Sequence, residues 1–149
     1  MLRSPDPAAY ERMRTRFRGL VDGAALATDT TAEVTFSGGA RTMKQNRTLE
    51  ARWVANAAAY GVVDQGPDPN SGSTDMANVS WVCPTIHPEL AIAPEGTPGH
   101  SVAFRDAAAT PAADEMTLLA ATLVAQSAYE LFMDDALRAA AWREFRGEA

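Results

Sequence analysis

The residues best suited to chemistry gather in one stretch, GSTDMANVSWVCPTIHPELAIAPEGTPGHS, which runs from Gly72 to Ser101. It contains both histidines of the chain, His87 and His100, and the only cysteine, Cys83. A neutral imidazole is a common zinc ligand, and a thiolate is a nucleophile or a metal ligand. The composition of this stretch therefore suggests a metal site or a thiol nucleophile.

His100 is the strongest candidate metal ligand. It follows EGTPG, whose glycines and proline can fold the backbone tightly and present the imidazole at the start of a helix. The alternative is a surface histidine next to a helix that Ser101 caps. His87 lies in PTIHPE, where it either contacts a substrate or is a turn residue. The 13-residue separation of the two histidines matches no compact zinc-binding spacing.

Asp75 and Cys83 leave two interpretations each. Asp75 lies in a Ser-Thr-Asp run that is typical of turns and helix caps, although a carboxylate can also orient a metal ligand. Cys83 is either a small core residue or a nucleophile assisted by His87 or His100. From the residue types alone, the metal site is incomplete.

Two helices and a strand are predicted in the first part of the chain. Apolar spacing predicts a helix over 10–24, and alternation of apolar and polar residues predicts a half-buried strand over 30–39. A second helix is predicted to end at Gly61, with Asn46 or Thr48 as its cap.

Strands and then helices are predicted in the second part. The apolar runs VSWVCPTI and ELAIA predict two buried strands. Thr110 and the proline after it predict the start of a long helix, which is apolar on most sides and is therefore expected to pack between a sheet and another helix. Asp134 begins a shorter amphipathic helix. This order of elements indicates an α/β or α+β fold.

The overall composition is typical of a soluble globular protein, with 149 residues, 46% hydrophobic and 21% charged, and a net charge of −6. No apolar run approaches the roughly 20 residues of a membrane span, and the N-terminal residues show no signal-peptide core. We therefore expect a cytoplasmic protein with no membrane association. Nucleic-acid binding is not expected either, because the alternating arginines over 12–18 spread around a helix and form no single stripe.

Five segments resemble, in order, the C-terminal third of a known family. These segments are GAALATDTTAEVTF, NRTLEARWVANAAAYG, GSTDMANVSWVCPTIHP, GTPGHS and LLAATLVAQSAYELFMDDALRAAAWREFR. The family is that of the zinc-dependent aminoacylase and carboxypeptidase-type amidohydrolases, in the aminobenzoyl-glutamate utilisation and dipeptidase branch. The resemblance implies an α/β fold. Residues 1–42 would be the last helix and strand of a ferredoxin-like lid domain, through which the protein forms a homodimer. Residues 43–149 would be the C-terminal part of an aminopeptidase-like catalytic domain.

The resemblance also implies a site that holds divalent metal ions, usually zinc. His100, in PGHS, would be the final metal ligand, and Asp75, His87 and Asn46 would lie near the substrate. The chain has neither a His-x-Asp motif nor a Glu-Glu pair, so no catalytic residue is assigned. The other ligands and the general base are expected upstream of Met1.

The expected function is that of a C-terminal fragment of a metal-dependent amidohydrolase, inactive alone. The intact enzyme would cleave an amide or peptide bond of an N-acyl amino acid or dipeptide, such as an aminobenzoyl-glutamate-like compound. The alternative is a non-catalytic subunit, or an oligomerisation module, that pairs with a separately encoded N-terminal part. A thiol enzyme that uses Cys83 is a third possibility.

Overall fold

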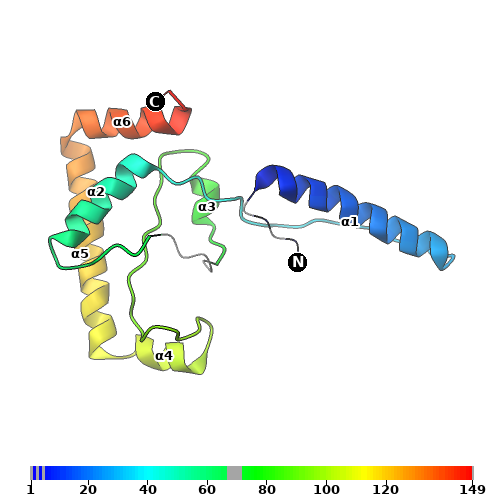
Figure 1. Cartoon of the computed structure of the whole chain (residues 1–149), viewed down its shortest axis with the longest axis horizontal. Coiled ribbons are helices and arrows are strands. Elements are labelled where there is room, and N and C mark those ends of the chain that lie inside the picture. Colours follow the sequence, from blue (N-terminus) through cyan, green and yellow to red (C-terminus); the bar gives the residue numbers. More distant parts are fainter. Residues whose placement is uncertain (1, 3, 5, 67–71, 149) are drawn as a thin grey trace. The chain divides into compact units, whose positions relative to one another are not determined.

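The structure is a computed structural model of the chain that describes residues 2, 4, 6–66 and 72–148 (Figure 1). These residues form helices and connecting loops, and none of them lies in a strand. The chain divides into two compact units: Met1–Lys44 with Gly72–Val82, and Gln45–Ser71 with Cys83–Ala149. The helices are α1 (Pro7–Ala27), α2 (Arg47–Ala58), α3 (Met76–Val79), α4 (Val102–Ala108), α5 (Pro111–Met133) and α6 (Asp135–Arg146).

The first unit contains α1, which confirms the first predicted helix. The Asp6 side chain caps it by accepting a hydrogen bond of 2.9 Å from the Ala8 amide. After α1 the chain turns back alongside the helix (Figure 1). Phe36 then meets Phe17 edge to face at 6.1 Å between ring centroids, and the Arg14 guanidinium lies 4.7 Å from the Phe36 ring.

The predicted strand over 30–39 is therefore wrong. Its alternating pattern correctly indicates one apolar side, because Val34 and Phe36 are less exposed than their neighbours. However, a strand also needs a second strand to accept and donate its backbone hydrogen bonds. The described part of the chain provides none, and the segment is held against α1 mainly by the contacts of Phe36 with Phe17 and Arg14.

The short helix α3 replaces the start of the next predicted strand. Its C-cap, Ser80, is fully buried and donates to the Ala77 carbonyl at 2.6 Å. The same hydroxyl accepts from the Lys44 amide at 2.9 Å, and the Trp81 indole donates to the Thr42 carbonyl at 2.8 Å. Side chains, rather than a strand ladder, therefore fix residues 42–44 to α3.

In the second unit α2 packs against α5 and α6, and α4 contacts α5 (Figure 1). Its core centres on Trp53, Ala57 and Leu123, with no exposed surface on Leu123. The predicted cap of α5 is confirmed, since the Thr110 hydroxyl accepts from the Ala113 amide at 3.3 Å. The run ELAIA, predicted to be a strand, is not one: Leu90 packs against the core from a loop.

The burial predicted for α5 on both sides is also wrong. One side packs against α2, but Leu118 and Phe132 on another side are 69% and 79% exposed. Over its most apolar 18 residues, α5 has a mean hydropathy of 1.3 and only 6% of these residues are buried. By length and composition α5 could cross a membrane, a property that it shares with core helices of soluble proteins.

The α/β fold inferred from the sequence is thus contradicted, because the described residues are helical and contain no sheet. This also removes the strand assigned to a lid over residues 1–42. The first unit ends at Lys44, but it also takes in Gly72–Val82. The identification of residues 1–42 and 43–149 as parts of a lid and a catalytic domain remains a prediction.

Candidate functional site

Asn46 joins three segments of the second unit. Its side-chain oxygen accepts from the Leu49 amide at 3.1 Å, which makes it the N-cap of α2. Its side-chain nitrogen donates to the Ala141 carbonyl at 2.9 Å, and its backbone amide donates to the Thr85 carbonyl at 3.1 Å. Asn46 is 3% exposed, so its amide group already has both kinds of partner within the fold. A role for it in substrate binding stays a prediction.

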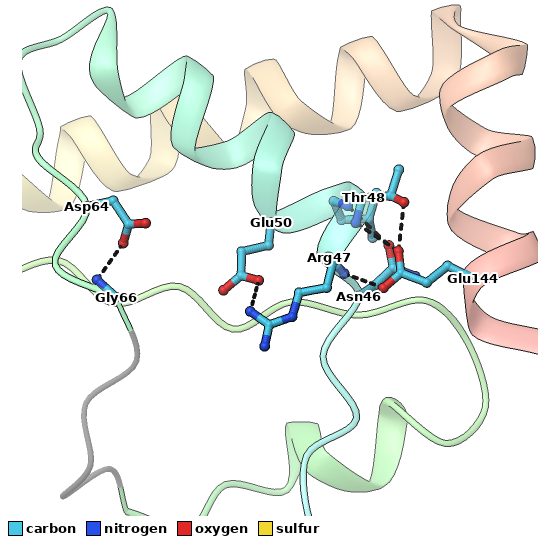
Figure 2. A network of polar contacts seen from close by, with 8 residues as sticks. Asn46, Arg47, Thr48, Glu50, Asp64, Gly66 and Glu144 are labelled. Carbon is cyan, nitrogen blue, oxygen red and sulfur yellow. Dashed lines mark hydrogen bonds and ion pairs between the residues drawn. The ribbon is translucent and has the colours of Figure 1, made fainter. Parts of the chain in front are cut away.

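Glu144 of α6 completes the capping of α2 from across the unit (Figure 2). Its carboxylate accepts from the amides of Arg47, at 2.6 Å, and Thr48, at 2.8 Å, and from the Thr48 hydroxyl at 2.7 Å. Burial raises the pKa of Glu144, but these hydrogen bonds and the Arg47 charge outweigh it, so the pKa lies below its ordinary value. Glu144 and Asn46 in Figure 2 thus hold α2 and α6 together at the positive end of the α2 dipole.

His100 lies at the end of the turn that precedes α4. It is exposed, and its φ of 56° places a non-glycine residue in the left-handed region. The next residue, Ser101, caps α4 by accepting from the Phe104 amide at 3.1 Å. This geometry presents the imidazole to solvent directly before a helix, as expected from the sequence. Metal binding by His100 stays a prediction.

The other candidates belong to different units of the chain. Asp75 is exposed and precedes α3 in the first unit, without a side-chain bond to the helix end. His87 is exposed and lies in a loop of the second unit. Cys83 is half-buried, with its sulfur 3.8 Å from the Thr85 hydroxyl. The roles assigned to Asp75 and His87 stay predictions.

The potential metal ligands that the structure describes do not form a metal centre by themselves. A catalytic zinc ion typically has three protein ligands. Across the described residues, no three side chains of His, Cys, Asp or Glu are grouped closely enough to hold a metal ion. His100 would therefore need further ligands from outside the described residues to hold such an ion.

A second feature, which the sequence analysis missed, is an apolar pocket of about 220 Å³ between α2, α5 and α6. Arg52 lines it, and its Nε atom lies 3.3 Å from Oε2 of Glu130. The Asn56 amide donates to the same carboxylate oxygen at 2.8 Å. This hydrogen bond, against the opposing effect of burial and with help from Gln126 and Arg52, lowers the pKa of Glu130.

The sequence signal for this pocket was only partial. Leu49 and Trp53 are four residues apart, as apolar residues on one face of a helix are, and both line the pocket. The charge pattern could not reveal that Arg52 and Glu130 meet, because 78 positions of sequence separate them and only the packing of α2 on α5 joins them.

One curated protein with significant similarity is an Xaa-Arg dipeptidase from Mus musculus. It is 33% identical to this chain over an alignment of 108 positions, and this alignment covers 68% of this chain and 24% of the mouse protein. The chain thus spans about a quarter of the length of this relative. No protein-family profile matches the sequence, and no solved structure matches it. The comparisons therefore establish a distant similarity to a dipeptidase.

Proposed function

We propose that this chain is the C-terminal portion of a metal-dependent amidohydrolase and is inactive alone. The observation that carries this proposal is the 108-residue similarity to the mouse Xaa-Arg dipeptidase. The intact enzyme would cleave an amide or peptide bond of an N-acyl amino acid or dipeptide. Within that class, an Xaa-Arg dipeptide and an aminobenzoyl-glutamate-like compound are the two substrates to compare.

The distribution of potential ligands supports the inactivity of the chain alone. His100 is exposed before α4, but the part of the chain that the structure describes groups no three potential metal ligands. A divalent metal ion, zinc in our proposal, would therefore need further ligands from the remainder of the intact enzyme. Asp75, His87 and Asn46 are proposed to serve the substrate side of that complete site.

The first experiment measures zinc by elemental analysis in the purified chain and in its His100→Ala variant, together with hydrolysis of both substrates. We expect no stoichiometric zinc in either protein and no hydrolysis by the chain alone. Zinc at one ion per chain that is lost in His100→Ala would contradict the proposal. So would hydrolysis that depends on zinc.

In a positive test, this chain replaces the matching stretch of the mouse dipeptidase. We expect the chimera to hydrolyse an Xaa-Arg dipeptide, and the same chimera with His100→Ala to lose that activity. Glu95→Ala, which changes another exposed residue before α4, is the matched control and should keep it. A folded chimera that is equally active with His100→Ala would remove His100 from the proposed site.

A second candidate function is that of a non-catalytic subunit that pairs with a separately encoded N-terminal part. The observation that favours it is the exposed apolar side of α5, which includes Leu118, Tyr129 and Phe132. Co-purification with a polypeptide that matches the remaining three quarters of the mouse relative would support this function. In either case we propose a cytoplasmic location, a small amide or peptide as substrate of the intact enzyme, and a homodimer formed through residues 1–42.

A further inference from the structure

The pocket between α2, α5 and α6 has a size suited to one small apolar group. Its volume of about 220 Å³ is below the roughly 300 Å³ at which pockets for drug-sized ligands begin. It equals the volume of about seven liquid water molecules, at roughly 30 Å³ each. Its apolar lining comes from Leu49, Trp53, Ile86, Val124, Leu131 and Leu137. A branched aliphatic or aromatic side chain would therefore gain favourable burial there.

Arg52 and Ser127 are the polar side chains that line this pocket, and the carboxylate of Glu130 lies directly beside Arg52, outside the lining. Arg52 lines the pocket, and its side chain is 40% exposed, so the guanidinium lies at the surface. One carboxylate oxygen of Glu130, whose side chain is 24% exposed, lies 3.3 Å from the Nε atom of that guanidinium. A guanidinium has five N–H donors. Among the described residues, Glu130 is the only ionic partner of Arg52, so most of these donors remain available.

This pair distinguishes between classes of ligand. A ligand with only a carboxylate would meet Arg52 favourably but would be repelled by Glu130. A ligand with only an ammonium group would be attracted by Glu130 and repelled by Arg52. An uncharged apolar ligand would gain nothing from either residue. A zwitterion can place its carboxylate next to Arg52 and its ammonium group next to Glu130.

We propose that this pocket binds a free α-amino acid with a branched aliphatic or aromatic side chain. The side chain fills the apolar pocket, the α-carboxylate accepts from Arg52, and the α-ammonium donates to Glu130. An α-amino acid fits because its carboxylate, its ammonium group and its side chain are all attached to one carbon atom. The inference stands independently of the proposed hydrolase function, since the pocket lining contains none of Asn46, Asp75, His87 and His100.

A ligand series on the unmodified chain tests the proposal by calorimetry. L-leucine is compared with 4-methylpentanoate, which lacks the ammonium, with 3-methylbutylamine, which lacks the carboxylate, and with N-acetyl-leucine amide, which lacks both charges. We expect L-leucine to bind at least about tenfold more tightly than each of the three. No binding of L-leucine or L-phenylalanine, or equal binding of any of the three analogues, would overturn the proposal.

A matched pair of variants locates the binding. Arg52→Met keeps an apolar stem but removes the guanidinium, whereas Arg47→Met removes an exposed arginine of the same helix that pairs with Glu50 outside the pocket. We expect Arg52→Met to weaken L-leucine binding at least about tenfold and Arg47→Met to leave it unchanged. Circular dichroism checks that both variants fold. Unchanged binding in a folded Arg52→Met variant would place the amino acid elsewhere and overturn the proposal.

Discussion

At the scale of single residues, Glu144 is the side chain on which the packing of α6 against α2 depends most directly. Glu144→Ala removes an acceptor of three hydrogen bonds and leaves the Arg47 and Thr48 amides without it. Because hydrogen bonds to a charged group are among the stronger ones, we expect a loss of about 2 kcal/mol in the free energy of unfolding. Urea denaturation followed by circular dichroism measures it. Glu148→Ala, which changes an exposed glutamate beyond α6, should cost little.

The same carboxylate predicts a pH dependence of stability. The pKa of Glu144 is lower in the folded chain than its ordinary value of 4.5. The folded state therefore favours the ionised form, and this stabilisation is fully present above pH of about 4.5 and is lost as the pH falls through the lower, folded value. We expect Glu144→Gln to lose less stability than the unmodified chain over that acid range. If the free energies of unfolding of the two proteins fell in parallel over that range, Glu144 would not be the source of this pH dependence.

His100 makes a further prediction at this scale. A left-handed residue with a side chain costs about 1 kcal/mol or more, and only glycine avoids that cost. We therefore expect His100→Gly to be about 1 kcal/mol more stable than His100→Ala, as measured by urea denaturation. A more stable His100→Ala variant would show that the backbone there is not held in the left-handed region.

At the scale of elements, we expect substitutions on the two sides of α5 to change the free energy of unfolding by very different amounts. Leu123 has no exposed surface, so Leu123→Ala should leave a cavity and cost about 3 kcal/mol of stability. Leu118, on the same helix but 69% exposed, is the matched control, and Leu118→Ala should cost less than about 0.5 kcal/mol. Thermal or urea denaturation compares them. Equal costs would mean that Leu118 is covered in solution.

Helices were predictable from the sequence because their signals are local. Thr110 caps α5 as expected, and Asn46, one of the two caps considered for the helix that ends near Gly61, caps α2. Asp134, expected to begin the last helix, caps it, since a cap needs only the next few amides. Strands were not predictable in this way. The alternation around Val34 and Phe36 requires only an apolar surface on one side, which α1 supplies as well as a sheet would.

The candidate site was predictable only in its local geometry. A glycine and proline turn followed by a serine was enough to place His100 just before a helix. The contacts of Arg52 and Glu130, and the double use of Asn46 by two helices, depend on which helix faces pack together. That pairing is a long-range property, and no local pattern encodes it.

At the scale of the whole molecule, the exposed apolar side of α5 predicts how the isolated chain behaves. The helix has no charged residue between Glu115 and Glu130, so nothing on it opposes association of apolar surfaces. We expect the isolated chain to have a mass above 15.9 kDa that rises with concentration in light scattering. Leu118→Glu combined with Phe132→Glu should restore the monomer mass without reducing stability, because both side chains are exposed.

The paired polar control separates this effect from a general change in charge. Thr15→Glu combined with Ser73→Glu adds the same two negative charges at exposed positions outside α5, and it should leave the association unchanged. If both double variants became monomeric, net charge rather than the α5 surface would govern association. A monomer at every concentration in the unmodified chain would show that exposed apolar side chains on α5 are not sufficient for self-association. In that case a partner of the kind proposed for a split hydrolase would have to be recognised by more than this one helix.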